Sequence, residues 1–526
     1  MDNILLGSLI AKILFAFRRA YATSFVKRLV DWFGNVYKHS AAHRFLRACL
    51  SRPSTLVYSR FYRMLDRFDG WIFHLNKSLR PAVENSLVIR AVRALQGASW
   101  WQDGVVVSSL RALGMRGVLL AAFALYLPID WFLRSALELT AIASIWDEAF
   151  LLFSVLYLLF RMLVTRRERI KPRATPIDAP ILFFLAAAFL VMMMVSPKMS
   201  IAVSGYRAVC QFMLWFFVLT RLIEDDRYLR VFYNTFCVMC VCIALHGIYQ
   251  YIIGVEIPAG WVSQSEMGVR TRVFSIIGSP NIMGSLMVFA APMLAALTYD
   301  KTRPLWGKLL LWGAVVVVCV AALFTFSRGA WFGLAIAVLL FCLIMDRKLV
   351  LLAVFAGVAV LLFVPEISNR ITYLFTADFQ EATNAGGRAI RWATGFSLLN
   401  TNPVFGFGLG RFGGAIAMQN QVVDGLKYFY MDNYYMKTLV EMGYAGLSAY
   451  LILLLATVVS CIRGMHKTHR DAHNALAVGM FCGMIGVLAH CYFENIFEVP
   501  YMNAYFWGFA AAIMFLSHRR KMRVGN

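Results

Sequence analysis

Charged residues are scarce in this chain. Aspartate, glutamate, lysine and arginine make up 15% of its 526 residues, whereas 60% are hydrophobic, and the mean hydropathy is +0.66. Soluble globular domains carry about 25% charged residues, so this composition excludes a water-soluble globular protein. We expect an all-α, polytopic integral membrane protein.

Acidic residues are the scarcer of the charged types, with 28 aspartates and glutamates against 51 lysines and arginines and a net charge of +23. Such an excess can indicate nucleic-acid binding. Here the basic residues are interrupted by apolar runs of about 20 residues, the length that crosses a bilayer. Anionic lipid headgroups account for the charge better, so we expect membrane lipids and no nucleic acid as partners.

The chain also lacks the cysteine patterns of metal sites and disulfide frameworks. Its ten cysteines are scattered, and no second pair at zinc-ligand spacing follows the cluster Cys237, Cys240 and Cys242. We expect no metal, no cofactor and no disulfide bonds. The N-terminus has no compact apolar core followed by a small-residue cleavage site, so we also expect no cleaved signal peptide.

The character of the chain changes near residue 116. Residues 1–100 carry 16 lysines and arginines against 5 acidic residues, interleaved with aromatic residues and leucine. We expect residues 1–116 to form basic amphipathic helices on the cytoplasmic leaflet. A small helical domain in the cytoplasm, packed on itself, is the alternative. Pro53 and Pro81 should break the helical pattern in either case.

Residues 117–517 contain about twelve apolar spans, and a cytoplasmic tail follows over 518–526. The short loops between spans that are rich in lysine and arginine all fall on one side, which the positive-inside rule places in the cytoplasm together with both termini. Two long segments, 253–279 and 365–433, are then external, and the second precedes the tenth span. The spans are expected near 117–136, 142–163, 179–196, 203–222, 229–252, 280–298, 308–326, 329–345, 349–364, 434–461, 475–492 and 501–517.

Arginines in the second external segment suggest an anionic ligand, and a lipid-linked phosphate is the natural candidate. Residues 387–399 have the periodicity of a short amphipathic helix that ends at the Asn400-Thr-Asn-Pro403 turn, with Arg388 and Arg391 one turn apart on one face. Two planar guanidinium groups on one face suit a pyrophosphate.

Two further motifs lie near the predicted outer face. The glycine-rich stretch Gly406–Gly410 has no lysine at a strand-to-helix turn, so we reject a nucleotide loop and expect tight backbone packing near a lipid-facing crevice. Arg328 lies at the outer junction of two spans. Its guanidinium either contributes to an anion site or extends to the lipid headgroups.

Five segments resemble the O-antigen ligase and polysaccharide polymerase family of bacterial membrane proteins. The resemblance covers residues 117–517 and includes the order of the motifs, the topology and the long external loop. The segments are Arg272–Asn281, Thr325-Phe-Ser-Arg-Gly-Ala-Trp331, Gly387-Arg388-x-x-x-Trp392, Asn402-Pro-x-x-Gly-x-Gly-x-Gly410 and Asp432-Asn-Tyr-Tyr-Met-x-x-Leu-Val-Glu-Met-Gly-Tyr-Ala-Gly446.

The resemblance implies an inverting, metal-independent glycosyltransferase on the outer face of the bacterial inner membrane. Its donor is a glycan on undecaprenyl or another polyprenyl pyrophosphate, and its acceptor is a hydroxyl of lipid A core, as in lipopolysaccharide biosynthesis, or of another lipid-linked repeat. By motif, Arg328 and Arg388 bind the pyrophosphate, and Trp392 and Asn433 lie in the substrate site. Their positions and positive charges make Arg391 and Arg272 further candidates for this site.

One position departs from the ligase pattern. Ligases of this family usually carry a histidine before the asparagine that aligns with Asn433, whereas this chain has Asp432. A carboxylate can also act as the general base, and polymerases resemble the Asp-Asn form more closely. The alternative is that Asp432 is the N-cap of the span that begins at Tyr434.

The remaining polar candidates lie in or near spans. His490 and Glu494, one helical turn apart, are reserve candidates for the base or the acceptor site. His246 is expected to be a packed, hydrogen-bonded residue, and Glu441 a helix–helix polar contact.

A transporter or flippase of lipid-linked glycans is the alternative function. It would normally show repeated halves and broken helices with polar groups near the midplane, whereas here no repeat is seen and the polar candidates gather at one face. Ligase and polymerase activities stay open, as do the sugar, the acceptor and the oligomeric state.

Overall fold

The computed structural model describes residues 23–41, 60–86, 105–164, 174–256, 271–377, 388–420, 430–468 and 473–523, with a few single residues between them. These residues form helices and no strand, so the all-α prediction is confirmed. The longer helices are α3 (Phe25–His39), α5 (Arg60–Glu84), α8 (Val105–Ala124), α11 (Trp146–Val164), α12 (Asp178–Val195), α13 (Met199–Cys210), α14 (Leu214–Leu222), α15 (Asp226–Ile253), α16 (Pro280–Leu297), α17 (Leu305–Phe324), α18 (Arg328–Met345), α19 (Lys348–Phe363), α22 (Arg388–Leu399), α24 (Tyr434–Thr468), α25 (Asn474–His490) and α26 (Pro500–Arg523).

Short helices connect them: α9 (Tyr126–Trp131), the π-helix η2 (Phe132–Ala136), α10 (Thr140–Ala143), the 3₁₀ turns η3 (Gln211–Met213), η6 (Ser275–Ile277), η7 (Tyr373–Phe375) and η8 (Ile496–Glu498), α20 (Pro365–Thr372) and α23 (Ala415–Asn420).

The protein is a polytopic membrane protein. Seven helices of the described residues are long and apolar enough to cross a bilayer, or up to nine if each of two bent pairs counts as one span. Each of the twelve predicted spans overlaps one or more helices of the fold, although those over 142–163, 475–492 and 501–517 overlap helices outside this set. The polytopic class is therefore confirmed, and the exact count of twelve stays a prediction.

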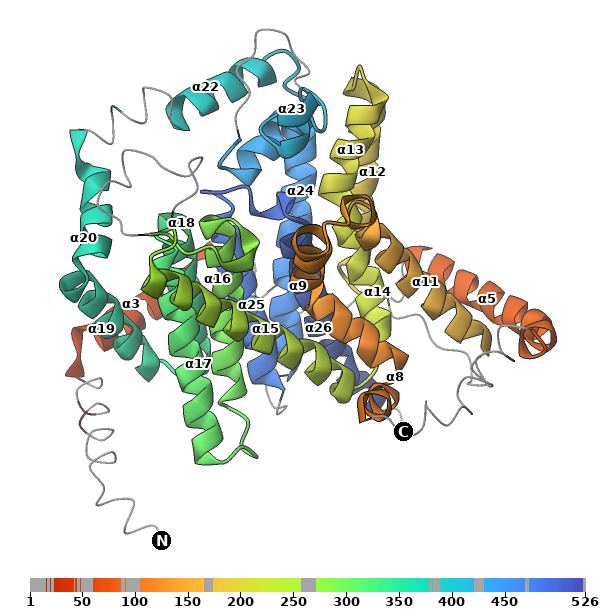
Figure 1. The fold of residues 1–526 in the computed structure, drawn as a ribbon, viewed down its shortest axis with the longest axis horizontal. Helices are drawn as coiled ribbons and strands as arrows, with labels where there is room; N and C mark the ends of the chain where they lie inside the picture. Colours follow the sequence, from red (N-terminus) through yellow and green to blue (C-terminus); the bar gives the residue numbers. More distant parts are fainter. Residues whose placement is uncertain are drawn as a thin grey trace.

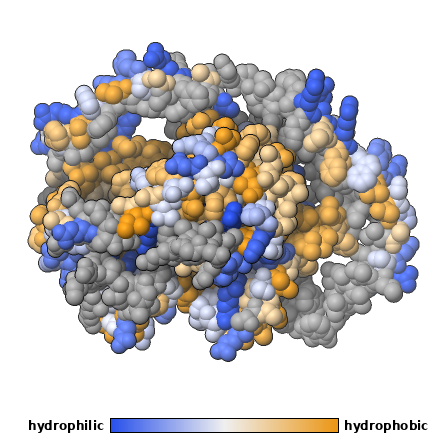
Figure 2. Space-filling view, turned by 90° about the horizontal axis from the view of Figure 1, so that it is seen from above, coloured by the Kyte–Doolittle hydropathy of each residue, from blue (hydrophilic) through white to orange (hydrophobic). Residues whose placement is uncertain are grey.

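Helix α16 lies at the centre of the C-terminal part of the bundle, in contact with α15, α17, α18 and α25 (Figure 1). Every residue of α16 is buried except Asn281, in its first turn. Outer helices instead expose large apolar side chains, such as Leu309 and Val316 on α17, and broad hydrophobic patches are visible from above (Figure 2). This arrangement suits a bundle that is surrounded by lipid.

The first predicted span, 117–136, is not one straight helix. It bends by 72° between α8 and α9, because Pro128 has no amide hydrogen and would clash with the carbonyl of Ala124 in a continuous helix. The Tyr505 hydroxyl from α26 stabilises this break: it donates to the Ala124 carbonyl at 2.9 Å and accepts from the Leu127 amide at 3.3 Å. The break therefore leaves these two backbone groups hydrogen-bonded at membrane depth.

The glycine-rich stretch packs against a second break, at Gly443 within α24, where φ is +66°. The stretch belongs to the loop over residues 400–414, called the glycine-rich loop below. The Phe407 and Gly408 amides donate to carbonyls before the break, and the Tyr444 and Ala445 amides donate to the Pro403 and Val404 carbonyls of this loop. A side chain at Gly443 would overlap the loop backbone. The expectation of tight backbone packing over 406–410 is thus confirmed, and this packing fixes the N-terminal half of α24.

A third bend joins α19 to α20 at 90°. Val364 is extended, with φ −120° and ψ 90°, as expected for a residue before proline, and Pro365 begins α20, where its missing amide costs nothing. Helix α20 therefore turns across the end of α19 (Figure 1).

The described helices of the N-terminal region are amphipathic. On α3, Phe25, Leu29, Trp32 and Val36 are all exposed, and they form one apolar stripe with helical spacing. A stripe of this kind suits a helix on a lipid surface, but surface attachment stays a prediction. The expected break at Pro81 is wrong, because the proline lies in the last turns of α5, where it removes only one hydrogen bond. Pro53 lies outside the described residues.

Candidate functional site

The predicted site residues come together at one end of the bundle. Helices α16, α18 and α24 begin there, α25 ends there, and α22 lies above them (Figure 1). Helices α18 and α25 pack closely because glycine residues at their contact have no side chain. A Cβ at Gly333 would approach the Gly486 carbonyl oxygen to 2.6 Å, and one at Gly329 would come within 2.7 Å of the His490 ring. Arg328, the first residue of α18, is thereby held beside the end of α25.

Arg388 and Asp432 form an ion pair across the site. The Nε of Arg388 donates to Oδ2 of Asp432, and its Nη2 donates to the Phe493 carbonyl at 3.2 Å. The guanidinium also lies 5.9 Å from the centre of the Phe493 ring. Arg388 remains about half exposed, so a ligand can reach it. Among the described residues, Oδ1 of Asp432 has no hydrogen-bond partner.

Helix α24 is capped by Asn433 and not by Asp432. The Oδ1 of Asn433 accepts a hydrogen bond from the Met436 amide at 2.9 Å, which is the geometry of an N-cap. The alternative reading of Asp432 as the cap is therefore wrong. Asn433 is almost completely buried, so its side chain supports the helix end, and its predicted contact with substrate stays untested.

Arg272, Asn281 and Glu494 form a hydrogen-bonded chain, in which Arg272 and Glu494 are buried and Asn281 is partly exposed. Arg272 donates to the Thr325 carbonyl at 3.0 Å and to Oδ1 of Asn281 at 3.1 Å, and the Asn281 amide donates to Glu494. Burial raises the pKa of the Glu494 carboxyl above its ordinary value, and the charge of Asp432 raises it further. Glu494 and Asp432 therefore belong to one electrostatic site.

Arg370 is a site residue that no sequence motif predicted. It lies on α20 and is buried although this helix is short and peripheral. Its charge acts on Arg328, as do those of Arg388 and Arg272. The only available sequence signal was one arginine in the amphipathic segment after Pro365, and the 90° bend that directs α20 toward the site could not be anticipated.

Arg391 and Trp392 lie on α22 beside the ion pair. Arg391 donates to the Tyr430 carbonyl at 3.2 Å, so it holds the chain just before Asp432. The Trp392 ring packs edge-on against Tyr492, with 6.0 Å between ring centres. The short helix predicted over 387–399 is confirmed as α22, although residue 387 itself lies outside the described residues.

His490 faces the bundle interior. Its Nδ1 is 2.5 Å from the Ser285 hydroxyl of α16, and the side chain is 1% exposed. Glu494 follows one turn later, since its amide donates to the His490 carbonyl at 3.1 Å. Of the two reserve candidates, Glu494 is the one joined to an arginine by hydrogen bonds, through Asn281.

A second buried polar cluster lies behind the site. Lys437 pairs with Glu441 at 2.8 Å, one turn later on α24, and Glu441 also accepts from the Phe412 amide at 3.3 Å. The expected helix–helix contact of Glu441 is therefore wrong in detail, because its partners are on its own helix and in the glycine-rich loop. Glu498 accepts from the Ala415 amide at 2.7 Å. This cluster joins the loop to α24 and η8.

The other singled-out residues lie away from the site. His246 is hydrogen-bonded to the Ser275 hydroxyl at 2.8 Å, as expected of a packed histidine. Cys237 and Cys240 are buried on α15, whereas Cys242 is exposed. In the described part of the chain no three histidine, cysteine or acidic side chains are placed to hold a metal ion.

Positive charge predominates in the assembled site. Its four guanidinium groups belong to Arg272, Arg328, Arg370 and Arg388, whereas its carboxyl groups are those of Asp432 and Glu494. Within this set of six side chains, at least two positive charges are not balanced. Such a site is arranged to bind an anion.

Comparison with known proteins finds a family match in the part of the chain that carries most of the site. Residues 313–451 match the family model described as O-antigen ligase, which confirms the resemblance noted in the sequence. The matched range contains Arg328, Arg370, Arg388 and Asp432, whereas Arg272 and Glu494 lie outside it. No curated protein matches the chain significantly.

Proposed function

Since residues 313–451 match the O-antigen ligase family, which carries out ligase- or polymerase-type reactions at the bacterial inner membrane, we propose that this protein is a glycosyltransferase with a lipid-linked donor. It transfers a glycan from polyprenyl pyrophosphate to a hydroxyl group of a second glycan. The observation that carries the proposal is the group of four arginines at one end of the bundle, one of which, Arg388, pairs with Asp432.

The arginines bind the donor pyrophosphate. A pyrophosphate that bridges a sugar and a polyprenyl chain carries about two negative charges, which matches the surplus of positive charge in the site. The sequence motifs assign Arg328 and Arg388 to the phosphates. Arg388 is the more accessible of the two, and Arg328 lies at the start of α18. As charge builds up on the departing pyrophosphate, fixed guanidinium groups stabilise it without rearrangement.

Asp432 is the general base. The acceptor oxygen forms a bond to the anomeric carbon while the bond from that carbon to the pyrophosphate oxygen breaks, and the hydroxyl proton moves to the carboxylate. Oδ1 would take this proton, since Arg388 binds Oδ2 and the buried Oδ1 has no hydrogen-bond partner among the described residues. Attack from the side opposite the leaving group inverts the anomeric centre. Arg272 and Asn281 hold Glu494 beside this carboxylate.

Donor binding also changes the base. In the absence of donor, Arg388 pairs with Asp432. When the guanidinium turns to the pyrophosphate, the carboxylate loses this partner and can accept a hydrogen bond from the acceptor hydroxyl. The carboxylate is thereby released from its ion pair only when the leaving group is in place.

The site faces the periplasm in this proposal. Lys301 and Arg303 lie between α16 and α17, at the end opposite Arg328, and Arg347 follows α18 at that same end. The positive-inside rule assigns this basic end to the cytoplasm. Lipid-linked glycans exposed on the outer leaflet are then the accessible donors.

The test is transfer by the purified protein in nanodiscs with a defined polyprenyl-pyrophosphate oligosaccharide. We expect a glycosylated acceptor with an inverted linkage, insensitive to chelator. Lipid A core as the productive acceptor would identify a ligase, and a second donor molecule would identify a polymerase. Movement of intact donor across the membrane without any change in its linkage would instead identify a flippase and refute the proposal.

A further inference from the structure

A cavity of about 610 Å³, called the basic cavity here, lies where the start of α15 packs against α8 (Figure 1). Two guanidinium groups line it, those of Arg227 and Arg230, and both side chains are exposed. Its other lining residues are Leu113, Ala121, Asp226, Val231, Asn234 and Thr235.

The α8 wall of the basic cavity contains a break in the helix. Gly114 has non-helical backbone angles, with φ +69° and ψ 161°, and the Arg227 guanidinium donates to the carbonyl of Ala112, just before the break. Arg227 thereby joins the broken turn of α8 to α15. Arginine has five N–H donors, so this contact occupies only one of them.

The lining of the basic cavity has a surplus of positive charge. Arg227 and Arg230 stand against Asp226 among these lining residues, and Oδ2 of Asp226 lies 3.8 Å from Nε2 of His473. The neighbouring Asp225 caps α15 by accepting a hydrogen bond from a first-turn amide at 3.0 Å. Two arginines and one aspartate leave about one positive charge, which matches one phosphodiester group.

The basic cavity lies at the end of the bundle that is rich in lysine and arginine. Hydrogen bonds from Thr302 lower the pKa of the Asp300 carboxyl, and the charge of Arg230 lowers it further. Arg230 is therefore close to the loop between α16 and α17, which also carries Lys301 and Arg303. The positive-inside rule assigns this end to the cytoplasm, so the nearest headgroups are those of the cytoplasmic leaflet.

The basic cavity continues into a second, apolar cavity of about 610 Å³ along α15. Asn234 and Thr235 line both cavities, and Val238 and Ile243 continue the wall. The lining of α15 thus changes from basic to uncharged polar to apolar along its length. The far end of the apolar cavity is closed at the α8–α9 break by Pro128.

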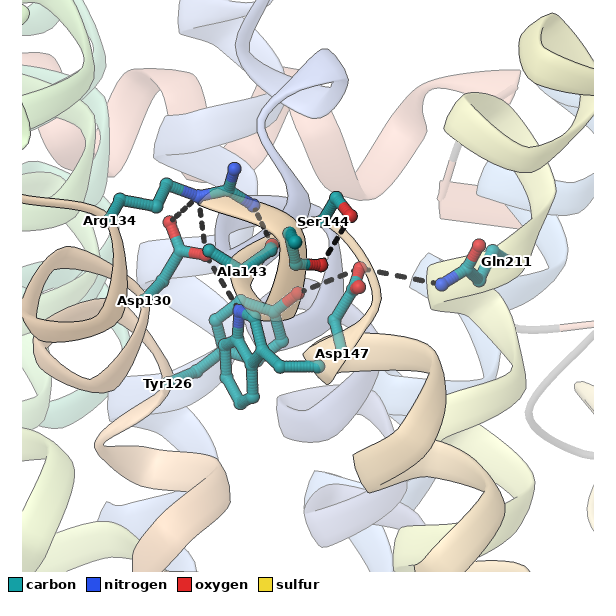
Figure 3. Close-up of polar contacts among 9 residues, drawn as sticks. Tyr126, Asp130, Arg134, Ala143, Ser144, Asp147 and Gln211 are labelled. Atoms are coloured by element: carbon teal, nitrogen blue, oxygen red, sulfur yellow. Dashed lines mark hydrogen bonds and ion pairs between the residues drawn. The ribbon is translucent and has the colours of Figure 1, made fainter. Parts of the chain in front are cut away.

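A polar network holds this far wall in place, as Figure 3 shows. Arg134 donates to Asp130 at 2.8 Å, and Asp147 accepts from Tyr126 at 3.3 Å and from Gln211 at 3.4 Å. These contacts tie α9 to α11 and η3. The bend that closes the groove formed by the two cavities is therefore a fixed part of the fold.

We propose that this groove binds one anionic glycerophospholipid, with its phosphate between Arg227 and Arg230 and an acyl chain in the apolar cavity. Basic pockets between membrane helices at the cytoplasmic side suit anionic headgroups, and the chain adds buried apolar surface. A free phosphate would leave the apolar cavity unused. The inference does not depend on the proposed function, because the donor pyrophosphate is assigned to the arginines at the opposite end of the bundle.

The first test measures phosphatidylglycerol binding to the purified full-length protein by native mass spectrometry in detergent. Arg230→Gln should weaken binding at least about tenfold, the loss expected when a hydrogen bond to a charged group is removed. Arg347→Gln is the matched control, because Arg347 is also exposed at the basic end but does not line the groove. Unchanged binding in Arg230→Gln, or an equal loss in both variants, would overturn the proposal.

The second test identifies the ligand on the parental protein in nanodiscs. Phosphatidylglycerol with a diazirine in its acyl chain should label the peptide that contains Val231–Ile243, and phosphatidylcholine with the same chain should label it at least fivefold less. Excess phosphatidylglycerol should remove the label, whereas glycerol 3-phosphate and polyprenyl pyrophosphate at the same concentration should not. Removal by glycerol 3-phosphate would identify a site for free phosphate, and removal by polyprenyl pyrophosphate a site for that lipid; either result, or equal labelling by the two phospholipids, would overturn the proposal.

Discussion

Arg388 donates a hydrogen bond through Nε to Oδ2 of Asp432, a residue 44 positions later in the chain. The pair joins α22, in the long segment before α24, to the residue that precedes the cap of α24. The group proposed to bind the leaving pyrophosphate is thus in direct contact with the group proposed to accept the proton. Donor binding and release of the carboxylate are coupled through this one contact.

Asp432→Asn should lower the transfer rate by about two to four orders of magnitude, the usual loss when a general base is removed. The amide still accepts a hydrogen bond from Arg388 but cannot take the acceptor proton. Single-turnover transfer with a defined donor measures the effect. A parental rate in this variant would assign Asp432 a structural role and direct the search for the base to Glu494.

The neighbouring residue is the matched control. Asn433→Ala removes the N-cap of α24 and should cost about 0.5–2 kcal/mol of stability while preserving most of kcat. Thermal unfolding in detergent and transfer rates on both variants should therefore give opposite patterns. A loss of transfer in Asn433→Ala at unchanged stability would place that side chain in contact with substrate.

Arg388→Ala should lower transfer by about two to three orders of magnitude, as does removal of a group that stabilises transition-state charge. Arg388→Lys should restore little, because lysine keeps the charge but not the planar fork that binds two oxygens. Initial rates at saturating donor provide the measurement. Arg303→Lys, in the loop between α16 and α17, is the control and should behave as the parent; full activity in Arg388→Lys would reduce the role of Arg388 to charge attraction.

Local patterns in the sequence predicted the elements that carry the site. The helix over Arg388–Leu399 follows from apolar spacing and a terminal turn, and the start of α18 at Arg328 follows from a boundary between apolar runs. Both depend on neighbours within a few residues, which the sequence contains. The same holds for tight packing at Gly406–Gly410.

Long-range partners could not be predicted in this way. The contact of Tyr505 with both sides of the α8–α9 break joins residues 378 and 381 positions apart. The burial of Arg370 depends on the direction of α20 after its bend, and the choice of Asn433 over Asp432 as the cap depends on where the first turn of α24 begins. Each is decided by tertiary packing rather than by local spacing.

Arg370→Ala should raise KM for the donor by about 10- to 100-fold, as expected for loss of a hydrogen bond to a charged group. Because Arg370 sits on a peripheral helix, we expect a smaller effect on kcat than that of Arg388→Ala. Donor titrations in the transfer assay separate the two constants. Glu366→Gln, an exposed position on the same helix, should leave both unchanged; an unaltered KM in Arg370→Ala would remove Arg370 from the donor site.

The pKa of Glu494 is raised, first by burial and then by the charge of Asp432. The folded protein therefore binds this proton more tightly than the unfolded chain. The resulting stabilisation of the folded state is complete below the ordinary glutamate pKa of about 4.3. It is lost as the pH rises through the pKa that Glu494 has in the folded protein. Glu494→Gln should remove this loss. Thermal unfolding across this pH range should show the parental stability falling relative to the variant, and parallel curves would contradict the assignment.

The orientation of the site can be tested with single cysteines in a background without native cysteines. Asn420→Cys lies at the end of α23, on the exposed surface near the site, and Lys467→Cys lies at the far end of α24. If the basic end of the bundle is cytoplasmic, an impermeant thiol reagent should label position 420 in intact cells and position 467 only after the membrane is permeabilised. The reverse pattern would place the arginines in the cytoplasm. The donor would then have to be a lipid-linked glycan of the inner leaflet, and transfer at the periplasmic face would be excluded.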